Sequence, residues 1–259
     1  MSAGIGRVAV VTGAGRGLGA VIVEQLSAEG YDVIATDIEG APRYLDVTDA
    51  QACRALALEV KPDVWINNAG ILGQGNAADA SDDLVARIVS VNLLGVMNGT
   101  RAAVAVMRER EGGRGKGHVV NIGSLASWVP VPGEAIYAAT KAGVLSFTLG
   151  LDGDLRDAGV TGIRFSVVCP DGMLTPMITE VIDDPAVALT FTGLRLVEPT
   201  EVAEAVSGVL RRHRRVVSVP HWRGAQVRAF GSIPDVVLRA APLFRRLGRA
   251  QQDRVRRVR

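Results

Sequence analysis

Aromatic residues, cysteines and histidines are all scarce in this chain of 259 residues. Phe, Trp and Tyr make up 4% of the sequence, with two Cys and three His. Few aromatics beside 30 Gly argue against a sandwich of aromatic-rich strands and favour a tightly turned α/β fold. Cys53 and Cys169 lie in different segments and form no metal-binding spacing. We therefore predict no metal site and expect a reducing, cytoplasmic compartment.

Long hydrophobic runs are also missing. No uninterrupted apolar run approaches the roughly 18 residues that a membrane-spanning helix needs. The apolar residues 8–11 are too few for the core of a signal peptide and run directly into glycines, so we expect no such peptide. With 48% hydrophobic and 22% charged residues, the composition is typical of a globular enzyme with one large domain.

Charge is distributed unevenly along the chain. The formal net charge is +2, but residues 223–259 hold ten Arg against two Asp, a net +8, which leaves −6 for residues 1–222. We treat 1–222 as one folded domain and 223–259 as a tail. Apolar residues recur on one helical side of this tail: Val236, Val237, Ala240, Ala241, Leu243, Phe244 and Leu247.

A basic amphipathic helix of this kind is compatible with a membrane surface or an acidic partner. Packing of its apolar side on the acidic body or on a partner subunit is the favoured interpretation. We expect no nucleic-acid binding, because aromatic residues are sparse and the helix has an apolar face.

The first predicted strand, residues 8–12, leads into a cluster of glycines and then a helical pattern. The spacing is Gly13-x-x-x-Gly17-x-Gly19. Glycines let the backbone approach a phosphate, and a helix N-terminus offers free N–H groups. Asp37 closes the second strand about 20 residues further on, where an adenosine ribose would lie. Its carboxylate would repel a 2′-phosphate, whereas Arg16 could pair with one. We therefore prefer NAD over NADP.

Polar residues interrupt the apolar middle of the chain. Asn67 and Asn68, with Gly70, follow the strand at 62–66 and suit either a turn that a ligand passes or a simple turn. The pattern predicts a long helix from Ser81 to about Glu109. Asn92 lies within it, and a buried amide must be hydrogen-bonded, so it either pins the structure or holds a water molecule.

A hydroxyl, a phenol and an ammonium follow. Ser124 ends the strand at 118–123, and Tyr137 and Lys141 lie one turn apart on one face of the next helix. A neighbouring cation lowers the pKa of a tyrosine, so the set suits acid-base chemistry. A core tyrosine, an exposed lysine and a strand-end serine would give the same pattern.

Later segments complete an alternation of strands and helices. Residues 163–168 and 216–219 predict strands, and residues 176–196, apolar and interrupted by Pro185 and Gly193, predict a mobile substrate lid. Seven strands alternating with helices indicate a doubly wound parallel sheet with helices on both faces. The helices at 81–109 and 137–159 are apolar nearly all round, which predicts a subunit interface.

Together these motifs resemble the short-chain dehydrogenase/reductase family over residues 7 to about 220. The ordered set, including the thirteen-residue step from Ser124 to Tyr137, carries the resemblance. It implies a Rossmann-like seven-stranded sheet, an NAD(H)-dependent oxidoreductase, and a homodimer or homotetramer. Tyr137 would be the general acid/base, Lys141 would lower its pKa and bind the nicotinamide ribose, Ser124 would hold the reacting oxygen, and Asn92 would keep a relay water.

The same resemblance implies the residues along the cofactor. The pyrophosphate, adenosine and nicotinamide parts would lie against Gly13, Arg16, Gly17, Leu18, Gly19, Asp37, Asp46, Val47, Asn68, Ala69, Gly70, Tyr137, Lys141, Pro170, Gly172 and Thr175.

Asp171 departs from the family pattern, which has a small residue there, and it would either select a polar group or cap a turn. The predicted substrate wall is otherwise apolar and favours a hydrophobic secondary alcohol or ketone. Its residues are Leu125, Trp128, Asp171, Met173 and Met177. Two alternatives stay open: a non-catalytic dinucleotide-binding sensor or scaffold, and an enzyme tethered to a membrane surface by its tail.

Overall fold

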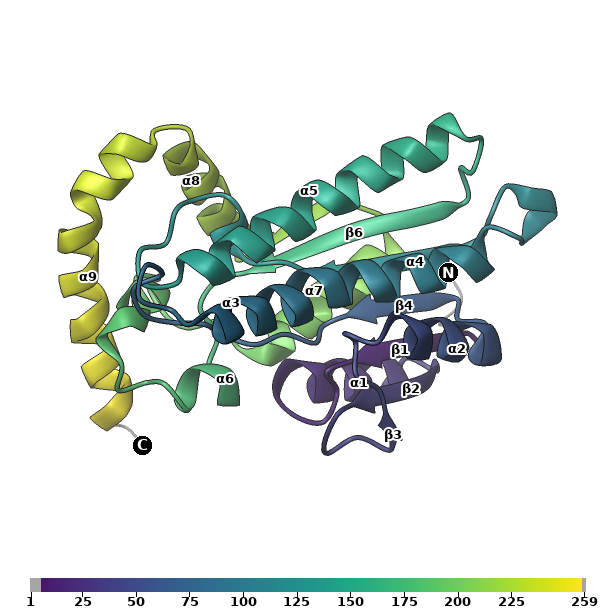
Figure 1. Cartoon of the computed structure of the whole chain (residues 1–259), viewed down its shortest axis with the longest axis horizontal. Coiled ribbons are helices and arrows are strands. Elements are labelled where there is room, and N and C mark those ends of the chain that lie inside the picture. Colours follow the sequence, from purple (N-terminus) through teal and green to yellow (C-terminus); the bar gives the residue numbers. More distant parts are fainter. Residues whose placement is uncertain (1–5, 258–259) are drawn as a thin grey trace.

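Seven parallel strands form one sheet at the centre of the molecule (Figure 1). The computed structural model describes residues 6–257, so the ends of the predicted domain and tail, 1–5 and 258–259, lie outside the described residues. The sheet order is β3-β2-β1-β4-β5-β6-β7, which confirms the predicted doubly wound sheet. The strands are β1 Val8–Thr12, β2 Asp32–Asp37, β3 Arg43–Tyr44, β4 Val64–Asn67, β5 Gly117–Ile122, β6 Ile163–Pro170 and β7 Val216–Val219.

Helices cover both faces of this sheet, because successive strand residues point to opposite sides. Val11 packs with Ile22 and Val206 in one core, whereas Val10 packs with Trp65 and Met107 in the other. The helices are α1 Gly17–Ala28, α2 Ala50–Val60, α3 Asp82–Val89, α4 Gly95–Met107, α5 Ala135–Asp157, α6 Pro176–Thr179, α7 Pro199–Arg211, α8 His221–Gly231 and α9 Pro234–Arg257.

The segment from β2 to α2 is short. It contains no helix, and β3 is only two residues long. Asp49 caps α2: its carboxylate accepts hydrogen bonds from the backbone N–H groups of Gln51 and Ala52, at 2.7 and 3.0 Å.

The predicted long helix is divided into three parts. A π-helical turn, Ser90–Leu94, joins α3 to α4 and contains Asn92. The continuous stretch Asp82–Met107 is long enough to cross a membrane, with a mean hydropathy of 1.2, and it is the single such helix in the part of the chain that the structure describes. Half of its most apolar window is buried inside the fold, as in a core helix.

The predicted tail packs on the predicted lid. α9 packs against the 3₁₀ helix Pro185–Phe191 of the lid at one end of the molecule (Figure 1). The lid contains α6 and a 3₁₀ helix, Pro185–Phe191, whose buried residues contact Val255 of α9. Gln252 donates hydrogen bonds to the carbonyls of Ile182 and Asp184. Residue 222 therefore does not separate an independent tail, and the lid is covered rather than free.

The apolar residues of the tail do not form one buried side. Ala241 is 6% exposed, and Val237 and Phe244 also face the interior, whereas Val236 and Leu243 are 57% and 59% exposed. Contact with the lid therefore uses only part of the apolar surface of α9. An exposed apolar stripe remains beside the arginines.

Candidate active site

A cavity of about 1060 Å³ opens at the carboxyl ends of the strands. Parallel α/β sheets bind ligands at this edge, where the strand order reverses between β1 and β4. The loop after β1 and the ends of β2 and β4 line one part of the cavity. The lid, α8 and α9 line the other part.

The glycine loop forms a cradle that side chains would fill. Gly13 and Gly17 have φ values of +65° and +60°, which favour glycine, and a Cβ on Gly13 would lie 2.6 Å from the Ala69 Cα. The Asn68 side chain donates hydrogen bonds to the carbonyls of Thr12 and Gly13 at 3.0 and 2.9 Å. These bonds fix the loop against the end of β4.

Two predicted residues of this region differ in how they contribute. Leu18 lines the cavity, but Gly19 does not: a Cβ there would overlap the Gly13 carbonyl. Gly19 therefore allows close packing beneath the loop rather than contact with a ligand.

Acidic side chains surround the far end of the cavity. Asp37 accepts hydrogen bonds from the backbone N–H of Gly15 at 2.9 Å and of Ile38 at 2.7 Å, so its carboxylate is held at the cavity wall. Asp46 and Val47 also line this end, and Asp46 accepts the Thr48 hydroxyl at 2.7 Å. The glycine cradle and the oriented carboxylate of Asp37 fit a dinucleotide.

Arg16 is turned toward the lid. Its guanidinium pairs with Glu180 through both nitrogens, and both side chains are more than half exposed. The arginine that could contact a phosphate is therefore engaged across the mouth of the cavity.

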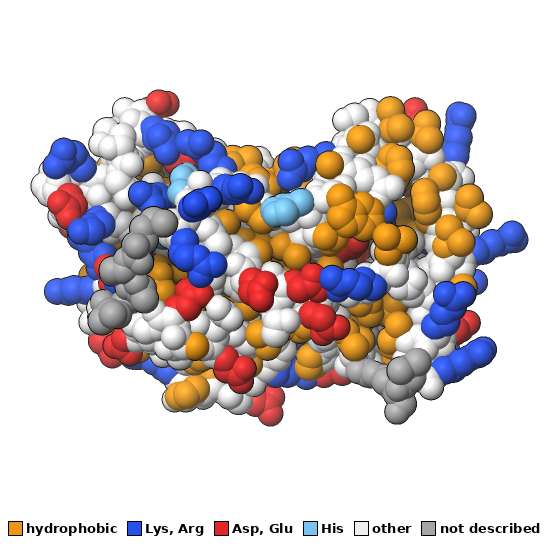
Figure 2. All heavy atoms as spheres, turned by 180° about the vertical axis from the view of Figure 1, so that it is seen from behind, with side chains coloured by type: hydrophobic (Ala, Val, Ile, Leu, Met, Phe, Trp, Pro, Cys, Tyr) orange, Lys and Arg blue, Asp and Glu red, His pale blue; other side chains and the backbone are white. Residues whose placement is uncertain are grey.

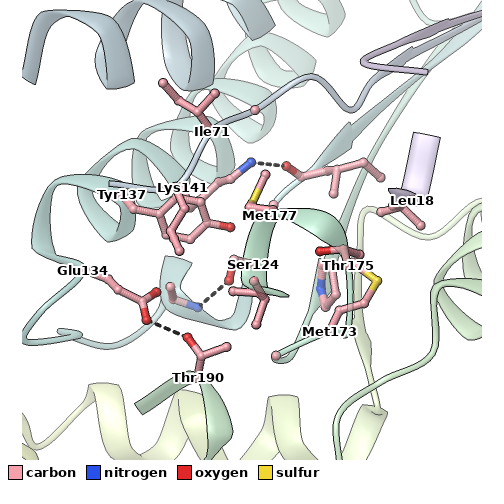
Figure 3. A pocket seen from close by; sticks show the side chains of 18 of the residues that line it. Leu18, Ile71, Ser124, Glu134, Tyr137, Lys141, Met173, Thr175, Met177 and Thr190 are labelled. Atoms are coloured by element: carbon pink, nitrogen blue, oxygen red, sulfur yellow. Dashed lines mark hydrogen bonds between the residues drawn. The ribbon is translucent and has the colours of Figure 1, made fainter. Parts of the chain in front are cut away.

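Ser124, Tyr137 and Lys141 meet in the middle of the cavity (Figure 3). Lys141 is 4% exposed, its Nζ donates to the Ile122 carbonyl at 2.9 Å, and it lies 5.6 Å from the centre of the Tyr137 ring. Burial lowers the pKa of Lys141 to about 8. The Ser124 hydroxyl accepts a hydrogen bond from Ala126 N–H at 3.1 Å, which leaves its proton available to a ligand.

The pKa of Tyr137 differs from the sequence expectation. Burial raises this pKa above its ordinary value of 10, the Glu134 carboxylate raises it further, and the Ser124 hydroxyl acts in the opposite direction. The expected lowering by Lys141 is therefore wrong for the protein by itself, because desolvation and a neighbouring acid dominate.

Asn92 lies behind this group and is fully buried. Its Oδ1 accepts the Ile71 N–H at 2.8 Å, and its Nδ2 donates to the Ile71 carbonyl at 2.8 Å and toward Thr140 at 3.4 Å. The amide thus pins the loop after β4. Its part in holding a relay water stays a prediction.

The substrate side contains four of the five predicted residues. Leu125, Asp171, Met173 and Met177 line the cavity, but Trp128 does not. The Trp128 ring instead lies 4.7 Å beneath the Arg228 guanidinium of α8, and this cation–π contact turns it away.

The carboxylate of Asp171 is paired with a residue of the tail. It accepts a hydrogen bond from Arg223 at 3.2 Å, and Arg223 also donates to the Thr192 hydroxyl at 2.9 Å. Asp171 therefore joins α8 and the lid at the end of β6. On the cofactor side, Pro170, Gly172, Thr175, Ala69 and Gly70 all line the cavity, as do Gly13, Arg16, Gly17 and Asn68.

Sequence reasoning missed several residues of this wall. Glu134 precedes α5 and looked like an ordinary polar residue at a helix start, and no periodicity marks it as buried. The residues of the tail lie outside the family pattern, so the resemblance implied no site role for them. The missed residues that line the cavity include Glu134, Arg223, Phe230, Val237, Ala241 and Phe244.

No group of three or more His, Cys, Asp or Glu side chains suited to a metal ion occurs within residues 6–257.

The chain is similar to known proteins over most of its length. The chain is 30% identical over 240 residues to the probable oxidoreductase EphD of Mycobacterium tuberculosis, a match that covers 80% of this chain and 40% of EphD. The chain thus spans less than half the length of this relative.

Two solved structures are similar over most of both chains. A short-chain dehydrogenase/reductase from Burkholderia phymatum in complex with NAD has a TM-score of 0.77 and 25% identity, covering 88% of this chain and 94% of that one. A single-residue variant of the actinorhodin polyketide ketoreductase with NADPH has a TM-score of 0.73 and 30% identity, covering 83% and 95%. The short chain dehydrogenase family model matches residues 41–186, more than half of the sequence. The chain belongs to the short-chain dehydrogenase/reductase family.

Proposed function

We propose that the protein is an NAD(H)-dependent oxidoreductase that interconverts a hydrophobic secondary alcohol and its ketone. The observation that carries the proposal is the meeting of Ser124, Tyr137 and Lys141 in one cavity with the glycine cradle and Asp37. A proton-transfer group and a dinucleotide cradle in one cavity suit the oxidation of an alcohol, which requires removal of both a proton and a hydride.

The residues have distinct roles in this reaction. The Tyr137 phenol gives a proton to the carbonyl oxygen in reduction and takes it back in oxidation. The Ser124 hydroxyl donates a hydrogen bond to the same oxygen and stabilises the negative charge that develops there. Lys141, fixed by the Ile122 carbonyl, favours the phenolate by its charge. A bound nicotinamide would accept or supply the hydride.

Asp37 and Arg16 support NAD over NADP. Asp37 lies at the end of β2 and would meet a 2′-phosphate with a like charge. Arg16, the residue that could attract that phosphate, is paired with Glu180. The two similar structures hold NAD in one case and NADPH in the other, so the support comes from this chain's own side chains.

A turnover screen tests the proposal directly. Purified protein is assayed at 340 nm with NAD⁺ or NADP⁺ and a panel of cyclic and linear secondary alcohols, and with the reduced cofactors and ketones. We expect turnover with the bulkier apolar alcohols and a preference for NAD⁺. Tight NAD binding without turnover of any compound would favour the non-catalytic sensor or scaffold instead.

The exposed stripe on α9 supports a second role at a membrane surface. Hydrophobic and basic side chains share the end of the molecule that carries α9 (Figure 2). Val236, Leu243 and Leu247 are each more than half exposed beside several arginines. Co-sedimentation with vesicles containing anionic lipid would test this, since Leu243→Ser with Leu247→Ser should abolish binding.

We also propose that α4 and α5 form a subunit interface of a homodimer or homotetramer. Leu94, next to α4, is 47% exposed and Leu149 of α5 is 36% exposed. Sedimentation at micromolar concentration should show an oligomer, and a monomer would refute this proposal. A reducing, cytoplasmic setting is supported by the two buried, unpaired thiols of Cys53 and Cys169.

A further inference from the structure

One carboxyl group in the substrate part of the cavity has no cation beside it. Glu134 is 4% exposed and lines the cavity, and no ion pair among residues 6–257 includes it. It occupies the N-cap position of α5, yet its side chain makes no capping hydrogen bond. The carboxyl instead reaches across to the lid, where it accepts the Thr190 hydroxyl at 2.6 Å.

The position of Glu134 has two physical costs. A buried carboxylate without a cation loses its hydration, and this raises its pKa to about 7. Its negative charge also disfavours the phenolate of Tyr137. The buried charge is therefore unfavourable both for the free energy of folding and for ionisation of Tyr137. A carboxyl group held in a cavity despite these costs is typical of a ligand-binding site.

The geometry leaves one oxygen of this carboxyl for a ligand. Oε1 accepts the Thr190 hydroxyl, and Oε2 makes no hydrogen bond within the described residues. Oε2 has no partner among these residues and is not fully enclosed by protein, so it faces accessible space. Figure 3 shows the Glu134 and Tyr137 side chains beside the same space as Ser124.

The position of Glu134 relative to Tyr137 indicates where a ligand group would lie. Glu134 lies directly before α5, Tyr137 lies in the first turn of that helix, and the carboxylate is near enough to raise the pKa of the phenol. A substrate whose reacting oxygen meets Tyr137 and Ser124 therefore has its adjoining atoms in the same part of the cavity as Glu134.

We propose that Glu134, positioned by Thr190, accepts a hydrogen bond from a second hydroxyl group next to the reacting carbon, so that the substrates are apolar vicinal diols and hydroxyketones. The proposal rests on the proposed oxidoreductase function. A hydroxyl fits better than an amine, because Lys141 and Arg223 line the same cavity and would repel another cation.

Two probes that differ only in the second hydroxyl test this subsite. Indan-1-ol and cis-indane-1,2-diol are oxidised with NAD⁺ by the full-length protein, and kcat/KM is compared. We expect the diol to be preferred by about tenfold or more, as for sites that hydrogen-bond a substrate hydroxyl. In Glu134→Leu the ratio of the kcat/KM values, diol over indan-1-ol, should fall by about that factor, because the accompanying change in the Tyr137 pKa acts on both probes and cancels in the ratio.

Three further variants separate binding from structure. Glu134→Gln keeps an acceptor oxygen and should retain part of the preference for the diol. Thr190→Val removes the positioning hydrogen bond and should raise KM for the diol while leaving KM for indan-1-ol unchanged. Glu204→Leu, which changes an exposed glutamate of α7, serves as the matched control and should behave like the wild type.

The outcomes distinguish this proposal from the proposed function. Turnover of indan-1-ol without any preference for the diol would overturn the subsite and leave the oxidoreductase assignment intact. Equal losses on both probes in Glu134→Leu would also overturn it, since they indicate a general structural role. If neither probe is oxidised, calorimetry on the NAD-bound protein decides: tighter binding of the diol to the wild type than to Glu134→Leu supports the subsite, and equal affinities refute it.

Discussion

The two walls of the cavity are built in different ways. The cofactor wall comes from short turns that directly follow strands: the glycine loop after β1, Asp37 after β2 and Asn68 after β4. The substrate wall is assembled from the lid, α8 and α9, and its shape depends on the packing of α9 against the lid rather than on turns that directly follow strands. The contrast teaches that local backbone geometry determines the first wall, whereas long-range packing determines the second.

Tyr137→Phe should have the largest effect, because it removes the proton-transfer group where the walls meet. We expect turnover to fall by about 10²- to 10⁴-fold, the usual contribution of a general acid or base. NAD affinity, measured by calorimetry, should change little. Tyr44→Phe is the matched control, because Tyr44 is 72% exposed. Substantial activity in Tyr137→Phe would refute the mechanism.

The residues of the cofactor wall were easier to predict from the sequence than those of the substrate wall. Motifs such as Gly13 to Gly19, Asp37 and Tyr137 with Lys141 depend on local spacing, so their places at the strand ends could be predicted. The paired strands themselves also followed from alternation of apolar runs and helices, since parallel sheets need crossover connections.

The substrate wall could be predicted only in part: four of the five predicted residues line it, but Glu134 and the contributions of α8 and α9 were not predicted. The burial of Glu134 depends on Thr190, 56 residues away, and the orientation of Trp128 depends on Arg228 of α8. The tail had a readable amphipathic pattern, but which part of it faces the lid is determined by contacts such as that of Gln252 with Ile182. Such contacts cannot be predicted from the spacing of residues in the sequence.

The pH dependence of stability tests the substrate wall through Glu134. Its pKa is raised from an ordinary value of 4.5 to about 7, so the folded protein binds more protons than the unfolded chain between these values. Stability should therefore fall as pH rises from 4.5 through 7 and then level off, by about 3 kcal/mol.

Urea denaturation at several pH values, comparing the wild type with Glu134→Gln, measures this contribution. The variant should gain stability relative to the wild type as pH rises. His118, whose pKa is lowered to about 3 by burial, produces the opposite trend below its ordinary value of 6.5 in both proteins and cancels in the difference. A constant difference between the two proteins across this range would contradict the predicted titration.

Asp37→Ala tests the cofactor wall with a smaller expected effect. If Asp37 binds the adenosine ribose as proposed, loss of its carboxylate removes these hydrogen bonds, and NAD affinity should fall by about 10- to 100-fold. NADP affinity should stay the same or rise, because a like charge has been removed. Asp32→Ala, at the exposed start of β2, is the control. Equal losses for both cofactors would place the role of Asp37 in the fold of the loop rather than in cofactor selection.

Gln252→Ala should have the smallest effect, and this effect should be limited to the substrate wall. Gln252 is 5% exposed and donates to the carbonyls of Ile182 and Asp184, so its loss leaves two lid carbonyls without this partner. We expect a loss of about 1–2 kcal/mol in unfolding free energy. Because the lid borders the substrate part of the cavity, KM for an apolar alcohol should rise while KM for NAD⁺ stays unchanged. Gln251→Ala is the neighbouring control, since Gln251 makes only a 3.5 Å contact with the Leu194 carbonyl. If KM for NAD⁺ rose in parallel, the two walls would be energetically coupled, which would contradict the view that they are built independently.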